Sequence, residues 1–413
     1  MQPTIKPKTA TYEAAPGEVK KVLLLYSGGL DTTILLKWIQ DVYKAQVVTL
    51  TVDLGQPGID LEECKKKATA MGAVKAVVVD AKKEFAEQYI AKAIKANALY
   101  QGQYPLATSI GRPLICKYAV KVAQEEQCDA VAHGSTGKGN DQVRLDGGVI
   151  ILDPKLKIIA PVRDFNLTRD VEMDYAKQHN IPIAHHKVSQ YSTDENIWGR
   201  SIECGILEHP EEMPPDDIYR MSVIPEKAPD QAEIITITFE KGIPVALNGK
   251  KMPLLSIIDE LNVIAGKHGV GLVDMTEDRV VGLKSREIYE CPAAFAIINA
   301  HKDLEKFTST IHQNSMKTAI DQKWCELAYY GLWQDPLMDS LNAFIEAQNS
   351  KVSGWVKVKL YKGQAIVVAR SSPNAIYNHA LASYTKEQTF NQAASPGFIE
   401  LWTLQTKMAN QRK

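Results

Sequence analysis

The strongest constraint on the fold is the alternation of short apolar runs with segments of helical periodicity in the first part of the chain. Residues 22–26 form an uninterrupted apolar run, which is typical of a strand buried on both faces of a parallel sheet. The next segment has apolar side chains at helical spacing, at Leu35, Trp38, Ile39 and Val42. The same strand and helix unit recurs at residues 47–71 and 76–99. This pattern predicts an α/β fold with a parallel sheet covered by helices.

Further elements extend this first domain, which we assign to residues 21–186, and residues 1–20 are expected to be a flexible N-terminal extension. These elements are a helix at 114–127, a strand at 130–133, candidate strands at 149–152 and 158–162, and a helix at 169–179. A polar stretch with five prolines follows at residues 187–230, so we place the domain boundary near His186.

The second domain, at residues 187–385, is predicted to be α+β. Its expected strands are 233–239, 245–247, 355–360 and 365–369, and its expected helices are 254–267, 295–307 and one long helix through 324–348. Residues 386–413 contain a last helix candidate at 397–408, which is too short to be stable alone. We expect it to contact another part of the fold or another subunit.

Composition excludes several classes of protein. Lys plus Arg number 48 against 49 Asp plus Glu, a formal charge of -1 that offers no bulk attraction to nucleic acid. The six cysteines form no C-x-x-C pair, and His185 and His186 have no further ligand nearby, so no protein metal site is expected. The first 20 residues contain no apolar run, and no stretch approaches the ~18 apolar residues that span a bilayer. We therefore expect a cytoplasmic protein without membrane or nucleic-acid partners.

The loop at residues 27–33, SGGLDTT, joins the first apolar run directly to a helix. Adjacent glycines allow backbone amides to approach an anion, hydroxyl groups add donors, and the helix N-terminus adds its positive dipole end. The loop is therefore predicted to bind phosphate. It is not a mononucleotide P-loop, because that motif requires G-x-x-x-x-G-K-[ST] and no lysine is present here.

A second glycine-rich segment, HGSTGKGNDQVR at residues 133–144, begins at the end of a predicted parallel strand. Parallel sheets bind ligands at this edge. The segment suits amino acids, because glycine amides and Thr136 can bind a carboxylate, Asn140 and Asp141 an ammonium, and Arg144 a second carboxylate. His133 is expected to form hydrogen bonds and not to act as a base.

The S-G-G-x-D-[ST] loop resembles that of the ATP pyrophosphatase superfamily, and this resemblance implies adenylation chemistry. With the segment at 133–144 and further segments, the chain resembles the argininosuccinate synthase family over residues 22–372. These further segments are 99–109, 192–201, 265–271 and 277–290. The family implies an ATP pyrophosphatase-type nucleotide-binding domain, a synthetase and multimerisation domain, and a C-terminal oligomerisation helix in a homotetramer.

The resemblance implies a C–N ligase that converts ATP, citrulline and aspartate to argininosuccinate, AMP and pyrophosphate through a citrullyl-adenylate. ATP, with its Mg²⁺, is expected to contact Leu25, Tyr26, Ser27, Gly28, Gly29, Leu30, Asp31, Thr32, Thr33, Val52 and Gly134. Aspartate is expected at Thr136, Asn140 and Asp141. Citrulline is expected at Tyr104, Ser109, Asn140, Arg144, Ser192, Ser201, Glu277 and Tyr289.

We assign catalytic roles to two of these residues. Asp31 is expected to help position magnesium, and Asp141 is one of three candidate acceptors for the proton of the aspartate amine, with phosphate and solvent as the others. The departures from the family pattern are Thr33 in place of serine, Gly111 in place of alanine, and the N-terminal extension.

Two other classes of function compete with this interpretation. A tRNA-thiolating or amidating enzyme with the same loop would need paired cysteines and a basic surface, or a glutaminase domain, and the sequence contains neither. A nucleotide-sensing module without turnover is the other alternative, against which the full set of expected amino-acid contacts argues.

Overall fold

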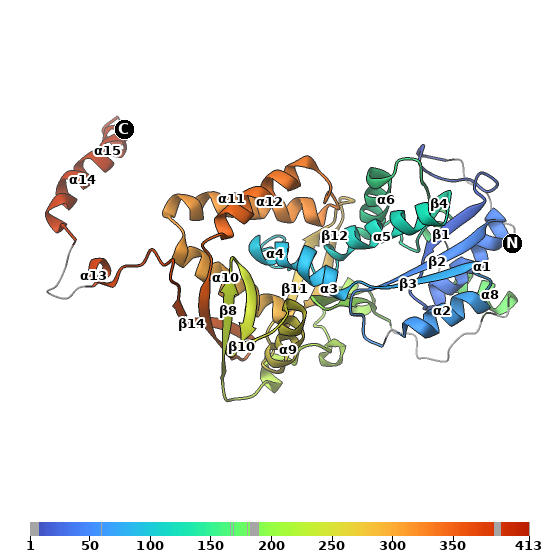
Figure 1. The fold of residues 1–413 in the computed structure, drawn as a ribbon, viewed down its shortest axis with the longest axis horizontal. Helices are drawn as coiled ribbons and strands as arrows, with labels where there is room; N and C mark the ends of the chain where they lie inside the picture. The colour runs from blue at the N-terminus through green and yellow to red at the C-terminus, as the bar shows by residue number, and fades with distance from the viewer. Residues whose placement is uncertain are drawn as a thin grey trace.

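The computed structural model describes residues 8–58, 60–165, 167, 169–179, 181, 190–383 and 390–412. Figure 1 shows a domain built on a parallel sheet, a larger α+β domain beside it, and C-terminal helices that project away from both. The expected boundary near His186 lies outside the described residues.

The first domain contains a five-stranded parallel sheet with the order β3-β2-β1-β4-β5. Its strands are β1 (Lys21–Leu25), β2 (Gln46–Asp53), β3 (Lys75–Asp80), β4 (Ala130–Ala132) and β5 (Lys157–Ile159). Its helices are α1 (Leu30–Tyr43), α2 (Leu61–Ala70), α5 (Gly111–Glu125), α6 (Asp141–Leu152), α7 (Pro161–Phe165) and α8 (Arg169–Gln178). The predicted parallel sheet is confirmed.

Both faces of this sheet are buried, as the continuous apolar strands predict. Leu23 belongs to one buried cluster, with α5 residues such as Leu114, whereas Leu24 belongs to another, with Leu35 of α1 and Ala68 of α2. Successive strand side chains point to opposite faces, so one short strand contributes to two cores.

Three predictions from periodicity are wrong in whole or in part. The strand expected at 158–162 ends at Ile159, because Pro161 begins helix α7. Residues 149–152 end α6 instead of forming a strand, because α6 packs closely on α5, with Cys116 Sγ where a Cβ on Gly148 would lie. The predicted long helix at 324–348 is two helices, α11 (Ile311–Tyr329) and α12 (Pro336–Asn349). The break contains Gly331 at φ +76°, a left-handed conformation that glycine adopts without strain.

The N-terminal extension differs from the expected loose tail in its described part. Glu13 forms a β-bridge with Ile158 of β5, and Ala14 donates a backbone hydrogen bond to the Ile158 carbonyl at 3.1 Å. Ala14 and Val19 are buried. Residues 12–14 therefore lie along the β5 edge of the sheet.

The second domain contains two antiparallel sheets. The four-stranded sheet has the order β11-β12-β7-β6, with β6 (Ser192–Asn196), β7 (Gly199–Glu203), β11 (Leu272–Asp278) and β12 (Lys284–Glu290). The five-stranded sheet has the order β10-β9-β8-β13-β14, with β8 (Glu233–Glu240), β9 (Ile243–Leu247), β10 (Lys250–Lys251), β13 (Gly354–Tyr361) and β14 (Gln364–Ser371).

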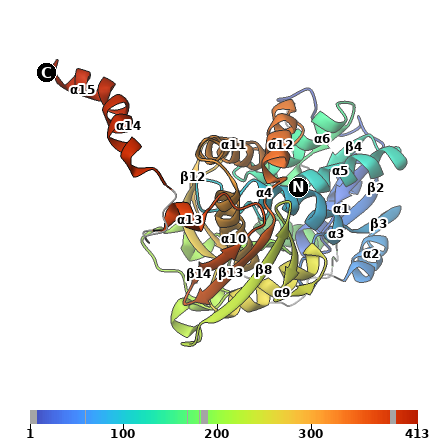
Figure 2. The same cartoon turned by 60° about the vertical axis from the view of Figure 1, so that its left-hand side comes forward.

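Helices pack against the larger sheet. Helix α10 (Pro292–Thr308) contacts β13 and β14, and α9 (Leu254–Lys267) contacts β9 and α10 (Figure 2). The polar, proline-rich stretch contains β6 and β7, followed by three short 3₁₀ segments, η2 (Gly205–Glu208), η3 (Asp216–Ile218) and η4 (Pro225–Lys227). The predicted α+β character of this domain is confirmed.

One segment of the first half of the chain packs within the second domain. The predicted helix at 85–99 is a short α3 (Lys82–Glu84), a π-helical segment η1 (Phe85–Ile90) and α4 (Ala91–Lys95). Helix α4 contacts α10 and α12, and Figure 1 shows it among those helices. The two domains therefore share one buried apolar cluster.

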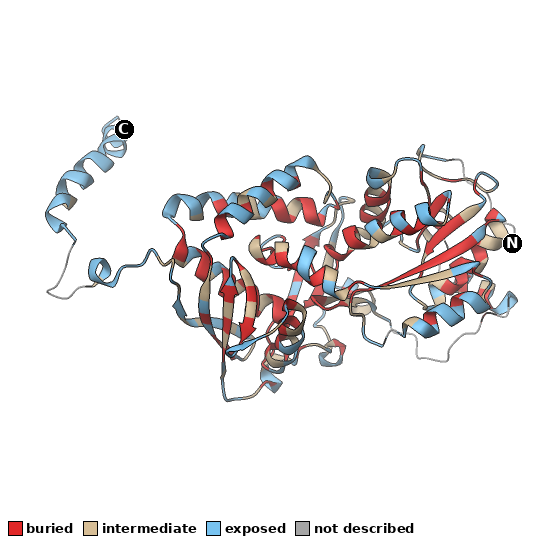
Figure 3. Ribbon diagram, in the orientation of Figure 1, coloured by how far each residue is buried: buried red, intermediate tan, exposed pale blue. Residues whose placement is uncertain are grey.

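The C-terminal helices make an extended arm. The predicted helix at 397–408 is two helices, α14 (Ser395–Trp402) and α15 (Leu404–Asn410), preceded by α13 (His379–Ala382) and η5 (Gln392–Ala394). Apart from the half-buried Ser395, every residue of α14 and α15 is exposed, including Leu401 at 76% and Trp402 at 75% (Figure 3). The arm thus presents apolar side chains to solvent.

Glu290 holds the stretch before η4 against β12. One of its carboxylate oxygens accepts hydrogen bonds from the backbone amides of Arg220, Met221 and Ser222 at 2.7 to 2.9 Å, and the other pairs with Arg200 at 2.6 Å. Glu290 is fully buried. Burying a carboxylate requires compensation of this kind.

We predict that Glu290→Gln lowers the free energy of unfolding by about 3 kcal/mol, because it leaves the Arg200 charge poorly compensated. Chemical denaturation measures this change. Glu240→Gln, at the exposed end of β8, is the matched control and should change stability by less than about 0.5 kcal/mol. Equal effects of the two substitutions would contradict the role of Glu290.

Candidate active site

The site lies where the strand order of the parallel sheet reverses. The chain proceeds from β1 outward to β2 and β3, then returns to place β4 on the other side of β1. The loops that follow β1 and β4 diverge at such a point and leave room for a ligand. These loops are residues 26–29 and 133–140, the two glycine-rich segments that the sequence analysis selected.

The loop after β1 is shaped by Gly28 and by hydroxyl groups. Gly28 has φ +77°, and a Cβ there would lie 2.5 Å from Cys64 Sγ, so the backbone must run close to α2. Ser27 Oγ and Thr32 Oγ1 lie 3.2 Å apart, and Thr33 Oγ1 donates to the Gly29 carbonyl at 2.8 Å. Ser27 is exposed and Thr32 is half-buried, and both line a cavity from which a ligand can reach them.

A cavity of about 720 Å³ opens on this loop. The predicted nucleotide contacts that line it are Leu25, Tyr26, Ser27, Gly29, Asp31, Thr32, Val52 and Gly134. Gly28, Leu30 and Thr33 do not line it: Leu30 packs near Ile34, while the Thr33 hydroxyl also lies 3.0 Å from the Tyr26 hydroxyl. These three residues stabilise the conformation of the loop without lining the cavity.

A second cavity, of about 370 Å³, adjoins the first and lies between the domains. The predicted amino-acid contacts that line it are Tyr104, Thr136, Asn140, Asp141, Arg144, Ser192, Ser201, Glu277 and Tyr289. Ser109 does not line it; this residue is fully buried, and its hydroxyl lies 3.4 Å from the Tyr104 hydroxyl. Its position behind Tyr104 makes it a support for that side chain.

The register of the four-stranded sheet gathers the contacts from the second domain. Tyr289 of β12 is opposite Ser201 of β7, and Ser201 is opposite Asp194 of β6. Residues two apart on a strand share a face, so Ser192 and Glu203 extend the same row. This face forms one wall of the second cavity.

Arg144 is buried and incompletely paired. Its Nε donates to the Tyr329 carbonyl at 2.8 Å and its Nη1 to Asp141 at 3.1 Å, whereas Nη2 has no partner among the described residues. The guanidinium lies 4.7 Å from the centre of the Tyr329 ring. Since a buried guanidinium donor needs an acceptor, the free Nη2 favours a ligand carboxylate in this cavity.

Asp141 lies between two guanidinium groups. Arg112 Nη2 donates to one of its oxygens at 2.7 Å and Arg144 Nη1 to the other. Burial alone would raise the pKa of Asp141, but the charges of Arg112 and Arg144 lower it well below its usual range. Asp141 therefore remains a carboxylate and is a weak proton acceptor.

Tyr329 connects several site residues although the sequence analysis did not select it. Its hydroxyl donates to Glu277 and accepts a 2.9 Å hydrogen bond from the Asn140 amide, and the Tyr289 hydroxyl donates to Glu277 at 2.5 Å. Burial raises the pKa of Glu277, against the lowering effect of these two tyrosine hydrogen bonds. The contacts of Tyr329 come from three distant segments of the chain, so no local sequence pattern indicates its role.

His133 forms hydrogen bonds, as expected. Its Nδ1 accepts from the Ser135 backbone amide at 3.2 Å, and its Nε2 lies 2.6 Å from Asp146, which also pairs with Arg163. These bonds fix the start of the loop after β4.

Several lining residues escaped the sequence analysis. In the second cavity these include Thr108, Arg112, Ser135, Thr193, Asp194, Glu203, Arg279 and Glu287. Arg279 pairs with Glu203 at 2.5 Å and with Glu287 at 2.6 Å. Burial, and then the charge of Glu287, raise the pKa of Glu203 to about 6. Asp194 and Glu203 could have been suggested from the sequence, because each lies two residues after a selected serine.

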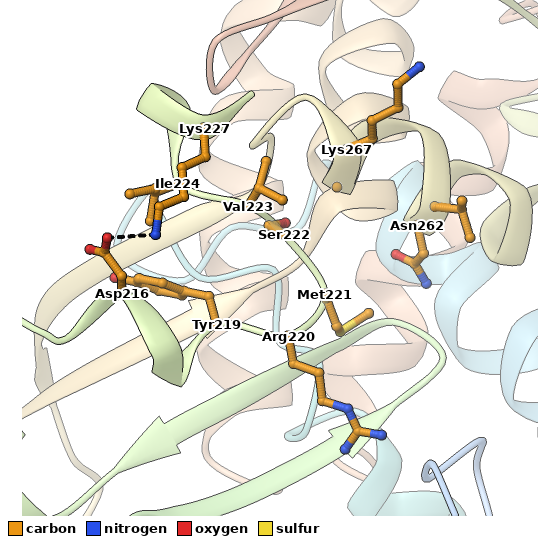
Figure 4. Close-up of a pocket in the computed structure, with 12 residues that line it drawn as sticks. Asp216, Tyr219, Arg220, Met221, Ser222, Val223, Ile224, Lys227, Asn262 and Lys267 are labelled. Atoms are coloured by element: carbon orange, nitrogen blue, oxygen red, sulfur yellow. Dashed lines mark hydrogen bonds and ion pairs between the residues drawn. The ribbon is translucent and has the colours of Figure 1, made fainter. Parts of the chain in front are cut away.

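A separate groove of about 520 Å³ lies between α9 and the stretch from η3 to η4 (Figure 4). Arg220 lines both this groove and the nucleotide cavity, and in Figure 4 its side chain points away from the Lys227 and Asp216 pair. The groove contains none of the predicted site residues.

Among the described residues, no group of three or more His, Cys, Asp or Glu side chains is placed to hold a metal ion, and His185 and His186 lie outside them. No helix within that part of the chain has the length and apolar character needed to cross a membrane.

A parallel sheet whose two glycine-rich loops meet a pair of adjoining polar cavities at the reversal point is the arrangement expected of an ATP-dependent ligase. Family comparisons agree. Residues 21–182 match the profile described as the arginosuccinate synthase N-terminal HUP domain, and residues 191–409 match that of the arginosuccinate synthase C-terminal domain. The chain therefore belongs to the argininosuccinate synthase family, and it is a C–N ligase.

Individual relatives cover nearly the whole chain. An argininosuccinate synthase from Pyrococcus furiosus is 53% identical over 94% of this chain and 94% of its own length. Those from Oceanobacillus iheyensis and Dictyoglomus turgidum are 51% and 52% identical over 94% of this chain, covering 93% and 97% of their own lengths. The tRNA-modifying, amidating and non-catalytic alternatives are therefore not favoured.

We predict that the KM for an amino-acid substrate bound in the second cavity rises as the pH falls through about 6. Glu203 lines this cavity, and its protonated carboxyl attracts an ammonium group less strongly. Steady-state kinetics between about pH 5.5 and 8 measure this trend. Glu203→Gln should raise KM at neutral pH and remove the acidic increase. An acidic increase that persists in this variant would assign the titration to another group.

Proposed function

We propose that the two cavities divide the substrates of an argininosuccinate synthase reaction between them. The ureido oxygen of citrulline attacks the α-phosphorus of ATP, the bond from that phosphorus to the bridging oxygen breaks, and pyrophosphate leaves with the electron pair. The aspartate amine then attacks the activated carbon, AMP leaves with the electrons of the C–O bond, and the amine loses a proton. The observation that carries the proposal is the contact of the loop cavity with a second, amino-acid-type cavity.

ATP is proposed to lie along the loop after β1, with its phosphates near Ser27, Gly29 and Thr32. Mg²⁺ arrives with the nucleotide, and Asp31, in the first turn of α1 and on the cavity wall, is proposed to help position it. The remaining predicted contacts, Gly28, Leu30 and Thr33, are proposed to keep the loop in shape.

Citrulline is proposed to use Arg144 for its carboxylate, and Ser192, Ser201 and Glu277 for its polar groups. Aspartate is proposed to meet Thr136, Asn140 and Asp141. The lowered pKa of Asp141 favours a fixed negative charge that attracts the substrate ammonium. Phosphate or solvent is then the better acceptor for the amine proton.

We further propose that the protein is a homotetramer in the cytoplasm, as the resemblance to the family implies. The exposed apolar side chains of α14 suit a subunit contact, namely Phe398, Ile399, Leu401 and Trp402. All six cysteines are free thiols, which is typical of a reducing compartment. The partners proposed are small molecules and further copies of this chain.

Pyrophosphate release with ATP, magnesium, citrulline and aspartate tests the reaction. Omitting citrulline should abolish release, because citrulline supplies the attacking oxygen. Arg144→Ala should raise the KM for citrulline by about 10-fold or more, since a charged hydrogen bond contributes about 1.5–3 kcal/mol. Release that does not depend on citrulline would refute the proposed reaction.

Removal of residues 386–413 tests the role of the arm. We predict a smaller assembly by size-exclusion chromatography with light scattering, because the apolar contact is lost. The double substitution Leu401→Asp with Trp402→Asp should have the same effect in the full-length chain. An unchanged mass in both variants would exclude the arm from assembly.

A further inference from the structure

Arg112 stands at the junction of the two cavities. Among the described residues, six line both: Arg112, Gly134, Ser135, Asp141, Thr193 and Asp194. Arg112 is the only cation in this set. If the triphosphate occupies one cavity and the ureido group the other, the α-phosphorus must lie at this junction.

The Arg112 side chain is held by two carboxylates, and only one of its three nitrogens donates to them. It lies in the first turn of α5, is 12% exposed, and donates from Nη2 to Asp141 at 2.7 Å and to Asp194. The described residues provide no acceptor for its Nη1 or Nε. A guanidinium has five N–H donors in a planar fork, so the unused edge can receive phosphate oxygens.

The charges around the nucleotide cavity also require a cation at this point. The loop at residues 27–33 contains no Lys or Arg, while Asp31, Asp141 and Asp194 contribute negative charge to the wall. The other cation on that wall, Arg220, is 59% exposed in its side chain and lies 3.9 Å from Glu195. Solvent therefore screens Arg220 more than Arg112.

We infer that Arg112 is a catalytic residue whose free N–H groups bind the non-bridging oxygens of the α-phosphate. In the first step, it stabilises the charge on these oxygens while the ureido oxygen bonds to phosphorus and pyrophosphate departs. In the second step, it binds the same phosphate as AMP leaves. Preorganised donors of this kind act where charge develops. This inference rests on the proposed division of the cavities.

A direct contact with the α-phosphate can be distinguished from an indirect effect through Asp141. In a single turnover with ATP, magnesium and citrulline but no aspartate, Arg112→Gln should slow the pyrophosphate burst about 100-fold or more. Arg112→Lys, which keeps the charge but loses the fork, should fall between this variant and the unaltered protein. Arg286→Gln is the matched control, because Arg286 is equally buried, pairs with Asp274, and lies outside both cavities.

A sulfur substitution provides a second readout. The two diastereomers of ATP with sulfur on the α-phosphate should react at different rates with the unaltered protein, and Arg112→Gln should reduce that difference several-fold. A purely structural role would leave the ratio unchanged.

Three outcomes are informative. A slow burst with a reduced sulfur effect supports the inference. A normal burst with a raised KM for aspartate overturns it and leaves Arg112 as a positioning residue for Asp141. An unaltered protein that releases no pyrophosphate with citrulline refutes the proposed function itself.

Discussion

The structure depends on the placement of β4 beside β1. Parallel pairing of these strands aligns their carboxyl ends, so the two glycine-rich loops face the same space although about a hundred residues separate them. Neither loop has enough side chains to enclose a substrate. The second domain provides the missing wall.

The four-stranded sheet supplies that wall through its register. Because β7 pairs with both β6 and β12, Ser201 is placed between Asp194 and Tyr289. A shift of one residue would turn these polar side chains away from the cavity and bring their neighbours in. The site is thus specified by backbone pairing as much as by side-chain chemistry.

The first sheet and the glycine-rich loop after β1 were predicted from local patterns in the sequence, whereas most of the polar residues that line the second cavity were predicted from the family resemblance. The strand expected at 149–152 failed because close packing of α6 on α5 outweighs strand propensity there. Tyr329, Arg112 and Glu203 were missed for a different reason. Their roles arise from contacts between distant segments, and only Glu203, two residues from the selected Ser201, has a neighbour in the sequence that could have pointed to it. Ser109, selected by resemblance, supports Tyr104 from behind the cavity wall.

The position of α4 has a consequence for the order of events during synthesis. Helix α4 leaves the ribosome early, yet its partners α10 and α12 come from residues 292–349. Domains usually fold as units, with the N-terminal one first. Ala93 and Ile94 of α4 are fully buried in the folded protein. Here, however, they cannot be buried until α10 and α12 have been synthesised. A ribosome-bound chain that ends near residue 190 would therefore expose the apolar face of α4. Chaperones would be expected to bind this face until the second domain is complete.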